Sequence, residues 1–334
     1  MTLRPADKLE LADALRAANR PGGKVVSVDL SALNRVIQHA PEDMTAKVEA
    51  GITLAALQEQ LRRRGQWLPI DPPHPERLTM AALVSANASG PRRFGFGTIR
   101  DHVIGLQVAL ADGRLASSGG NVVKNVAGYD LMKLFIGAGD SLGIPVEITV
   151  KLLPVPEAES FVQTVCATLA EAEQLTGEVL ASELAPVVLD WHRAGRACPE
   201  QAERAGSASG ELRVVLGFAG DAEQVRWQQS RAAELGFHQS ATLDYEQQFW
   251  AEHAGATGRL SVLPSRLGIT VRELVPGPFV ARAGNGLVHY PACPEPVEGA
   301  RPTSPPPRLT PLDALCRRVK DGFDPNHLLP NLPA

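Results

Sequence analysis

Residues 119–135 read GGNVVKNVAGYDLMKLF, a stretch in which Lys124 and Asn125 lie among valines with glycines on both sides. Polar side chains in so apolar a setting are expected to satisfy backbone carbonyls, because buried polar groups need hydrogen-bond partners. Glycine lets the chain bend closely, and Asp130 is a residue type that begins helices. The stretch therefore predicts a turn out of a strand pair, followed by a short helix from Leu131 to Ile136.

The segments on both sides of this stretch combine helical and strand patterns. Apolar residues at helical spacing predict a helix over residues 54–64, which Thr53 caps. Alternation over residues 103–110, followed by the pair Asp112–Gly113, predicts a β-hairpin, because Asp-Gly adopts the positive φ angles of a tight turn. Strand alternation returns at residues 148–152. Together these patterns indicate an α+β fold.

The sequence pattern changes near residue 157: glycine-rich loops become fewer, and the spacing of apolar residues follows strand and helix periods more regularly. We therefore expect a first domain over residues 1–156 and a second α+β domain over residues 157–290. Residues 291–311 are too rich in proline to pack as a core element and are interpreted as a linker or an inserted loop. Residues 312–334 are expected to form a C-terminal helix and a tail.

Composition excludes several classes of protein. The 334 residues carry a formal net charge of −4, which offers no basic field for nucleic acid. The four cysteines lie far apart, without histidines at metal spacing, and predict neither a disulfide framework nor a metal site. No apolar run is long enough to span a bilayer and no signal peptide is recognisable. A cytoplasmic location is therefore expected, with any membrane association running through partner subunits.

Glycine-rich loops concentrate between Pro69 and Pro145 and predict a ligand cradle, because successive backbone N–H groups form anion-binding concavities. One of them, Gly137-x-Gly139-x-x-x-Gly143, approaches a dinucleotide fingerprint. That fingerprint needs a strand before it and a helix after it, whereas here a helix precedes and a strand follows. A Rossmann domain is therefore not expected.

Five blocks of the sequence resemble one family. They are VEAGITLAALQEQL (48–61), QWLPIDPPHPERLT (66–79), NASGPRRFGFGTIRDHVIGLQVALADG (87–113), GGNVVKNVAGYDLMKLFIG (119–137) and FDPN (323–326). In these blocks the chain is similar to the FAD-binding subunits of bacterial glycolate oxidase, within the flavoprotein superfamily of vanillyl-alcohol oxidase and D-lactate dehydrogenase. The resemblance implies an α+β fold with a two-lobed PCMH-type FAD-binding domain over residues 1–156, a lobe boundary near residue 70, and a smaller cap domain over residues 157–290.

The resemblance also implies a set of contacts to non-covalently bound FAD. Asp71, Pro72 and Thr79 match the segment beside the flavin pyrophosphate and ribityl chain; Ala86, Asn87, Ala88 and Ser89 match a second flavin loop; Phe96, Gly97 and Thr98 match a further position near the flavin; and Gly139, Asp140, Ser141, Leu142, Gly143 and Ile144 match the stretch at the adenine end. Loop amides and small hydroxyls of this kind bind diphosphate without a lysine.

The chain departs from the family pattern at four places. The connection 19–24 is short where relatives have a long glycine-rich loop around the pyrophosphate, and Ala81–Ala82 replaces a glycine pair. Asp140 begins the segment that usually reads Gly-Thr-Leu-Gly and brings a carboxylate to the expected diphosphate. Like charges repel, so this carboxylate disfavours diphosphate binding. Pro145 replaces a residue that normally continues the strand. Each departure weakens the expectation of tight FAD binding.

Catalytic residues are not assigned. Oxidation of a 2-hydroxy acid needs a base near the substrate hydroxyl, a cation for its carboxylate and a hydride acceptor. Four histidines and three arginines qualify by residue type, but none lies in a recognisable constellation: His74, His102, His192, His289, Arg92, Arg93 and Arg282. A lone histidine is more often structural.

The resemblance and this scarcity of catalytic groups predict an accessory FAD-binding subunit of a glycolate oxidase or dehydrogenase complex, which oxidises glycolate, a small 2-hydroxy acid, to glyoxylate. The implied partners are a larger FAD-containing subunit and an iron–sulfur subunit, since this chain has no cysteine cluster for an iron–sulfur centre. Two alternatives stay open. One is a flavin-free structural subunit of the same complex, which the shortened loop favours. The other is a self-contained FAD-dependent 2-hydroxy-acid dehydrogenase.

Overall fold

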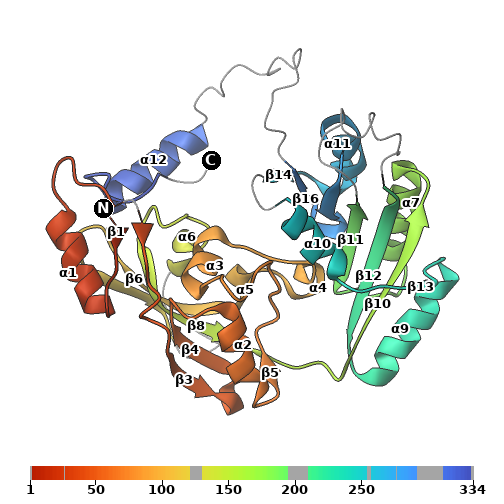
Figure 1. The fold of residues 1–334 in the computed structure, drawn as a ribbon, viewed down its shortest axis with the longest axis horizontal. Coiled ribbons are helices and arrows are strands. Elements are labelled where there is room, and N and C mark those ends of the chain that lie inside the picture. Colours follow the sequence, from red (N-terminus) through yellow and green to blue (C-terminus); the bar gives the residue numbers. More distant parts are fainter. Residues whose placement is uncertain are drawn as a thin grey trace. The chain divides into compact units, whose positions relative to one another are not determined.

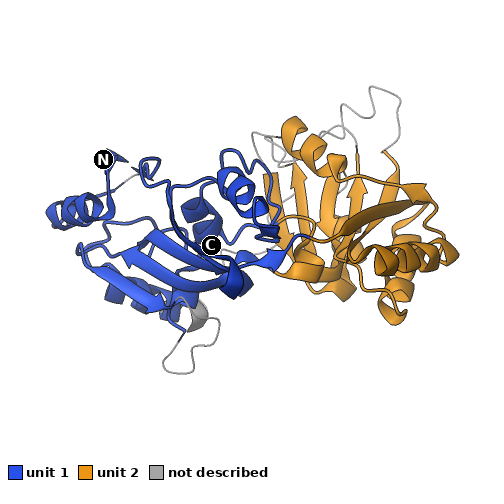
Figure 2. Cartoon of the chain, turned by 90° about the horizontal axis from the view of Figure 1, so that it is seen from below, with its two compact units in different colours: residues 1–89, 98–155, 302–334 blue, residues 90–97, 156–301 orange. Residues whose placement is uncertain are grey.

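The computed structural model describes residues 2–25, 27–120, 130–194, 210–253, 257–275, 277–291 and 311–331. The predicted role of Lys124 and Asn125 therefore lies outside the described residues. Two compact units divide the chain (Figure 2). Unit 1 comprises residues 1–89, 98–155 and 302–334, and unit 2 comprises residues 90–97 and 156–301. Each unit thus draws on separate stretches of the sequence.

Unit 1 is built from short helices and mostly antiparallel strands (Figure 1). Its elements are β1 (Thr2–Leu3), α1 (Lys8–Ala18), β2 (Ser27–Val28), β3 (Val36–Ala40), the 3-10 helix η1 (Pro41–Asp43), β4 (Thr45–Glu49), α2 (Leu54–Arg62), β5 (Gln66–Trp67), α3 (Met80–Ala86), α5 (Ile99–His102), β6 (Val103–Ala109), β7 (Leu115–Gly119), α6 (Met132–Phe135), β8 (Ile144–Lys151), β9 (Leu153–Pro154) and α12 (Pro311–Phe323).

A five-stranded antiparallel sheet in the order β3-β4-β8-β6-β7 forms the centre of unit 1. Because side chains alternate along a strand, Val48, Ile148 and Val150 point to one face, where they pack with the leucines of α1 and α2 and with α3. The other face carries Lys47 and Glu147. A parallel pair of β1 and β2 and an antiparallel pair of β5 and β9 complete the unit.

Helix caps predicted from the sequence are present at α2 and α3. The Thr53 hydroxyl accepts a hydrogen bond from Ala56 N, and the Thr79 hydroxyl accepts one from Ala82 N at 3.2 Å. The predicted cap at Asp130 was wrong. α6 is a single turn that begins at Met132 after a bend, and Asp130 contributes only its carbonyl oxygen, which accepts from Lys133 N.

Unit 2 is a seven-stranded antiparallel sheet with helices, in the strand order β13-β10-β12-β11-β15-β16-β14. Its elements are α4 (Arg93–Phe96), β10 (Ala158–Cys166), α7 (Leu169–Ala181), β11 (Val188–Arg193), β12 (Leu212–Gly220), α9 (Ala222–Glu234), β13 (Gln239–Ser240), α10 (Asp244–Glu252), β14 (Thr257–Ser261), the 3-10 helix η2 (Pro264–Arg266), α11 (Leu267–Leu274), β15 (Phe279–Arg282), the 3-10 helix η3 (Ala283–Asn285) and β16 (Leu287–Pro291).

The two faces of the unit 2 sheet differ in chemistry. Leu189, Trp191 and Phe279 contribute to a hydrophobic core with residues of α7, α9 and α11. Strand alternation places Asp190 and Arg282 on the opposite face, where they meet α10. Within the described ranges, no helix of either unit is both long and apolar enough to cross a membrane.

Candidate functional site

Two of the predicted flavin loops lie side by side in unit 1. α3 ends at Asn87, which adopts the left-handed conformation with φ of 47°. The loop after α6 binds to that end: Gly137 N donates to Val84 O at 3.0 Å, and Gly139 N donates to Ser85 O at 2.9 Å. The structure therefore brings the predicted contacts of residues 86–88 next to those of residues 139–140.

The surface of this loop pair is bare backbone with one unsatisfied acceptor. Gly137 and Gly139 have φ of 86° and 58°, and a Cβ added to Gly137 would lie 3.4 Å from Asn87 Cβ. Glycine is favoured there because other residues are strained at positive φ. The Asn87 Oδ1 atom is buried and has no hydrogen-bond partner among the described residues. An orphaned amide oxygen beside uncovered glycines fits a polar ligand such as a dinucleotide.

Asp140 lies in the same loop with φ of 61°, in the left-handed region that glycine adopts more easily. Its carboxylate accepts a hydrogen bond from the Ser85 hydroxyl. Burial raises the pKa of Asp140, although the bond from Ser85 acts in the opposite direction. A raised pKa makes the carboxyl easier to protonate, which moderates the repulsion expected between Asp140 and a diphosphate. Sequence reasoning missed Ser85, since nothing in the local pattern pairs it with a residue 55 positions away.

Other predicted contacts use their side chains elsewhere. The Ser141 hydroxyl is buried and donates to Ala138 O at 2.6 Å, and the Thr98 hydroxyl donates to Asp101 Oδ2 at 3.1 Å. Leu142 and Ile144 belong to the hydrophobic core, and Gly143 and Pro72 are also buried. Phe96 and Gly97 fall in unit 2, whereas Thr98 falls in unit 1. Asp71, Thr79 and Ser89 are half-buried. Their role as flavin contacts, like that of the other residues in this paragraph, remains a prediction.

Comparison with known proteins identifies the segment that contains the first of these loops. Residues 15–119 match the family model described as an FAD binding domain. This part of the chain is therefore similar to an FAD-binding domain. Over 159 residues the chain is 33% identical to the glycolate oxidase subunit GlcD of Bacillus subtilis, covering 48% of this chain and 34% of that one. It is 35% identical over 133 residues to the glycolate oxidase subunit GlcE of Escherichia coli, with coverage of 40% and 38%.

Other relatives and a solved structure agree with the FAD-binding domain. A D-lactate dehydrogenase of Archaeoglobus fulgidus is 31% identical over 170 residues, or 50% of this chain and 35% of that one. The chain thus spans about a third of the length of these curated relatives. An alkyldihydroxyacetonephosphate synthase structure superposes with a TM-score of 0.69 over 100% of this chain and 77% of that chain, at 16% identity. That likeness establishes the PCMH-type α+β fold.

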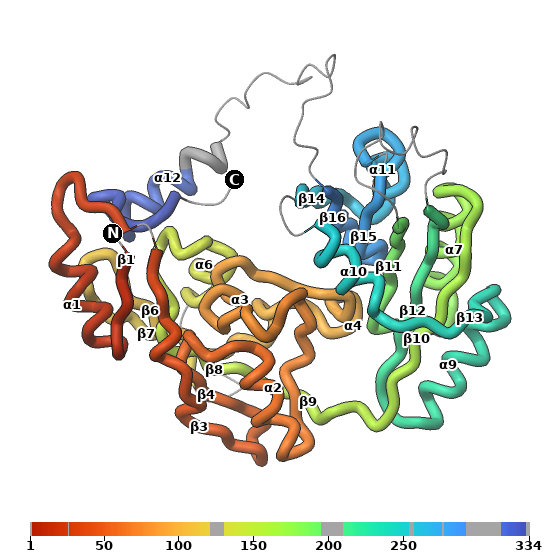
Figure 3. The backbone as a smooth tube through the Cα atoms, in the orientation of Figure 1, coloured from red at the N-terminus to blue at the C-terminus, as the bar shows by residue number. Residues whose placement is uncertain are grey.

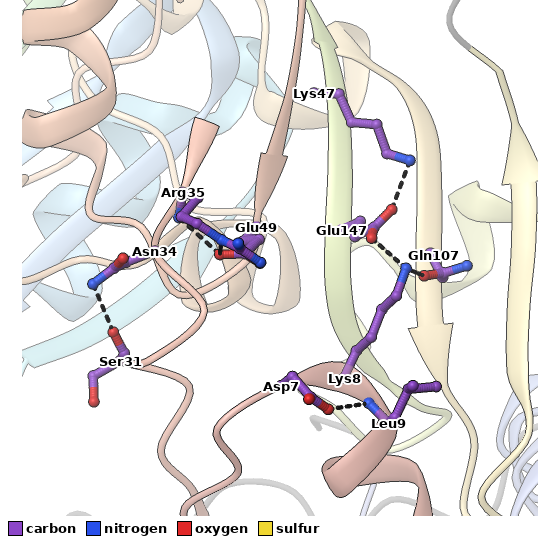
Figure 4. Close-up of polar contacts among 10 residues, drawn as sticks. All are labelled: Asp7, Lys8, Leu9, Ser31, Asn34, Arg35, Lys47, Glu49, Gln107 and Glu147. Atoms are coloured by element: carbon purple, nitrogen blue, oxygen red, sulfur yellow. Dashed lines mark hydrogen bonds and ion pairs between the residues drawn. The ribbon is translucent and has the colours of Figure 1, made fainter. Parts of the chain in front are cut away.

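A charged cluster lies on the five-stranded sheet of unit 1, on the face that carries Lys47 and Glu147 (Figure 4). The matched residues 15–119 contribute β3, β4, β6 and β7 to this sheet. Lys8 and Lys47 both bond Glu147, and Lys8 also donates to Gln107 at 2.9 Å. Burial by itself raises the pKa of Glu147, but the two lysines outweigh it and lower the pKa. Cavities of about 250 and 90 Å³ flank Glu147, and no predicted flavin contact lines either one. This cluster is therefore separate from the flavin loops.

Unit 2 gathers several of the candidate catalytic residues into one buried ionic cluster. Arg282 is 1% exposed and donates to Asp190 Oδ2 and to Glu246 Oε1, each at 2.5 Å. The Tyr245 hydroxyl donates to Asp190 at 2.7 Å, and the Tyr245 ring stacks on His192 with 4.3 Å between ring centroids. One guanidinium thus serves two carboxylates, so its charge is already neutralised within the protein.

Burial shifts the pKa values of residues in and beside this cluster. Burial away from water raises the pKa of Asp190 to about 7; the neighbouring Glu246 carboxylate adds to the rise, whereas Arg282 and the Tyr245 hydroxyl oppose it. Burial lowers the pKa of His192 and His289 to about 4, so both rings are neutral near pH 7. In the described ranges, no group of three or more His, Cys, Asp or Glu residues is arranged to hold a metal ion.

The remaining candidates lie apart from this cluster. Arg92 forms a bidentate ion pair with Glu159 at 2.9 Å and lies over the Phe161 ring. His74 is exposed at the surface of unit 1, and His102 is buried at the end of α5. Sequence reasoning found His192 and Arg282 but missed their carboxylate partners, although alternation along β11 places Asp190 on the same face as His192.

Proposed function

We propose that this chain is an FAD-binding subunit that participates in oxidising a small 2-hydroxy acid, with glycolate to glyoxylate as the reaction. Its partners are a larger FAD-containing subunit and an iron–sulfur subunit. The proposal is supported by the FAD-binding domain over residues 15–119 and by relatives named as glycolate oxidase subunits and D-lactate dehydrogenase. The observation that carries it is the loop pair at Asn87 and Gly139, which offers bare backbone and an orphaned acceptor.

FAD bound at these loops supplies the hydride acceptor for oxidation of a carbon-bound alcohol. The chain's own contribution is to bind and to orient. Gly137 and Gly139 carry no side chain that would block the approach of a ligand to the backbone, and the Asn87 amide oxygen is available to accept a hydrogen bond from FAD. In this proposal residues 1–156 form the FAD-binding domain and residues 157–290 the cap domain, joined through 291–311 to the C-terminal helix and tail at 312–334.

The accessory role is supported by the buried cluster of unit 2. A substrate carboxylate requires a cation, but Arg282 is bonded to Asp190 and Glu246, and releasing it would leave two buried carboxylates unpaired. His192 is neutral and therefore has the charge state of a base, yet it is only 8% exposed under the Tyr245 ring. These side chains are suited to holding unit 2 together, so acid–base chemistry falls to a partner subunit in this proposal.

The first test is FAD binding by the purified chain. Titration with FAD, followed by flavin fluorescence and by the visible spectrum, should give saturable one-to-one binding. Gly137→Ala should weaken binding, because a side chain at φ of 86° is strained and meets Asn87. Gly236→Ala is the matched control, since Gly236 also has a positive φ, 96°, but lies in unit 2 with no atom near its Cβ position. Absence of saturable FAD binding by the unmodified chain would sink the proposal.

The second test separates the accessory role from a self-contained dehydrogenase. Dye reduction with glycolate is measured for the chain alone and after mixing with the larger FAD-containing subunit and the iron–sulfur subunit. We expect turnover only in the mixture. Glycolate-dependent reduction by the chain alone would instead identify a self-contained 2-hydroxy-acid dehydrogenase.

A flavin-free structural subunit is the second candidate, and one observation favours it. The short connection between α1 and β2 is bonded by the C-terminal end of the chain, through Asn326 to Asn19 and through Leu328 O to Val25 N. In the family pattern a long loop around the pyrophosphate occupies this position. A short connection whose polar groups bond to the C-terminal end of the same chain favours a unit that needs no nucleotide. A normal unfolding transition without any FAD binding would support this candidate.

A further inference from the structure

The C-terminal end of the chain returns to unit 1 and lies beside its N-terminal strand (Figure 3). We call residues 320–329 the C-terminal strap. The strap comprises the last residues of α12, the FDPN segment and the three residues that follow it. Its residues Leu328 and Leu329 are buried in the core of unit 1. The strap contacts both of the segments that the family resemblance assigns to the FAD phosphates and adenine, namely 19–25 and 138–143.

Lys320 is the most constrained polar group of the strap. It is 5% exposed, and its ammonium donates to Ser141 O at 2.7 Å, to Asp324 Oδ2 at 2.6 Å and to Leu329 O at 3.3 Å. Asp324 is fully buried and accepts from the backbone amides of Leu328 and Leu329, each at 2.9 Å. The ammonium thus uses its three donors, and the ion pair ties the strap to itself and to Ser141.

The bond to Ser141 acts on the loop that holds the unusual Asp140. That loop is a tight turn in which Ser141 N and the Ser141 hydroxyl both bond Ala138 O, at 3.1 and 2.6 Å. Asp140 has φ of 61°, a conformation that persists in a non-glycine residue only when the surroundings fix it. Lys320 helps to fix this conformation, because its ammonium donates a charge-assisted hydrogen bond to the carbonyl of Ser141, the residue that follows Asp140.

A second contact fixes the entry to the same loop. The Phe323 ring packs edge-on against the Phe135 ring, with 5.5 Å between centroids and 87° between planes. Phe135 ends α6 immediately before the loop of residues 136–143. The strap therefore holds this loop at both its entry and its exit, while Asn326 and Leu328 hold the connection 19–25.

We propose that Lys320 is a positioning residue for the flavin site and that the C-terminal strap keeps the 138–143 loop in the conformation that binds FAD. The inference rests on the proposed function for its consequence on FAD affinity, but not for its consequence on the loop itself. Loss of the strap bond releases the Ser141 carbonyl, lets Asp140 leave the left-handed conformation and disorders the backbone next to Gly139.

The test variant is Lys320→Met combined with Asp324→Asn, which removes both charges and so avoids an unpaired buried carboxylate. Lys320→Arg is the milder variant, because a guanidinium keeps the charge but does not reproduce the three ammonium bonds. Arg317→Met, an exposed position on the same helix, is the matched surface control. Val48→Ala, a buried position on β4, is the control for general loss of stability.

Amide hydrogen exchange of the chain without FAD is measured for residues 137–143 and for β10 and β12 of unit 2. The double variant should exchange roughly tenfold faster at 137–143, the effect of losing one charge-assisted bond, with unit 2 unchanged. Lys320→Arg should show a smaller change in the same direction, and Arg317→Met should match the unmodified chain. Val48→Ala should leave the ratio of the exchange rate at residues 137–143 to the rate in the rest of unit 1 unchanged. FAD titration of the same proteins should show a Kd raised roughly tenfold by the double variant.

The two proposals fail in different ways. If the unmodified chain binds no FAD, the proposed function is wrong, and hydrogen exchange still decides whether the strap holds the loop. If FAD binds but the folded double variant and Lys320→Arg both keep the unmodified exchange rates and Kd, the positioning role of Lys320 is refuted. Equal weakening by Val48→Ala at matched stability would also refute it, since the effect would then follow from stability alone.

Discussion

Replacing Asp190 by asparagine should make the stability of unit 2 less dependent on pH between pH 6 and pH 9. Asp190 is fully buried and shares the Arg282 guanidinium with Glu246. Burial raises the pKa of Asp190 from 3.8 to about 7 in the folded chain. A group with a raised folded pKa contributes stability that is present below the unfolded pKa and is lost as pH rises through the folded pKa. The stability contributed by Asp190 is therefore present below about pH 3.8, falls as pH rises toward the folded pKa of about 7, and is fully lost above it.

The magnitude follows from proton linkage. Between the unfolded pKa of 3.8 and the folded pKa of about 7, each pH unit costs about 1.4 kcal/mol for one displaced proton, and above the folded pKa the cost levels off because both states are deprotonated. The free energy of unfolding should therefore fall by about 1.4 kcal/mol between pH 6 and pH 9 through Asp190 alone. The Asp190→Asn variant removes this loss, because asparagine does not titrate. Its amide oxygen still accepts from the Tyr245 hydroxyl, as Asp190 Oδ2 does at 2.7 Å.

Urea unfolding at pH 6 and pH 9 measures the difference. In a Trp67→Phe background the remaining tryptophans, Trp191, Trp227 and Trp250, all lie in unit 2, so tryptophan fluorescence reports on that unit. Asp244→Asn is the matched control, since Asp244 is an exposed carboxylate on the same helix as Glu246. A decrease between pH 6 and pH 9 that is equal in the Asp190 variant and the unmodified background would refute the assignment of a raised pKa.

Three further outcomes are expected. Asp140→Gly should tighten FAD binding about tenfold in a fluorescence titration, because it removes a carboxylate from the phosphate side while glycine adopts the left-handed conformation readily; weaker binding would contradict this. Glu147 has a lowered pKa, so its stabilisation is present above its usual pKa and is lost as pH falls through the folded pKa. Glu147→Gln should therefore destabilise unit 1 by about 1 kcal/mol at pH 7 but hardly at pH 3, as measured by urea unfolding, and an equal loss at both pH values would count against it. Gly51→Ala places a Cβ 1.8 Å from Leu30 O and should cost about 3 kcal/mol or more, so an unchanged Tm would show that the backbone yields there.

Local chemistry made part of the fold readable from the sequence. Thr53 and Thr79 cap their helices as predicted, and the Asp112–Gly113 turn closes the predicted hairpin with Gly113 at φ of 78°. The strand at Val36–Ala40 was not predicted. It is a half-exposed edge strand with a bulge between Val36 and Gln38, so its side chains do not show the alternation by which strands are recognised.

The candidate sites were readable only where they depend on local backbone. The glycines of the predicted flavin loops are visible in the sequence, whereas their assignment as flavin contacts came from the family resemblance and stays a prediction. The ionic cluster of unit 2 joins Arg282 to residues 92 and 36 positions away, and no spacing rule within one sequence links such positions. The same holds for Lys320, whose bond to Ser141 spans 179 residues. Residue type alone selected Arg282, but its two carboxylate partners decide that its charge is used for structure.

Both buried charge clusters satisfy their charges within the chain, and this has a consequence for how the protein works. Lys320 and Asp324 neutralise each other in unit 1, and Arg282 is shared by two carboxylates in unit 2. Breaking either pair would strand a buried charge at a cost of about 3–5 kcal/mol, so neither cluster is suited to handing a charge to a substrate. What unit 1 offers a ligand is instead glycine backbone without side chains and the orphaned Asn87 oxygen. In the proposed function, FAD binding and turnover of a hydroxy acid are therefore separable, and the affinity for FAD is the quantity that substitutions in unit 1 test directly.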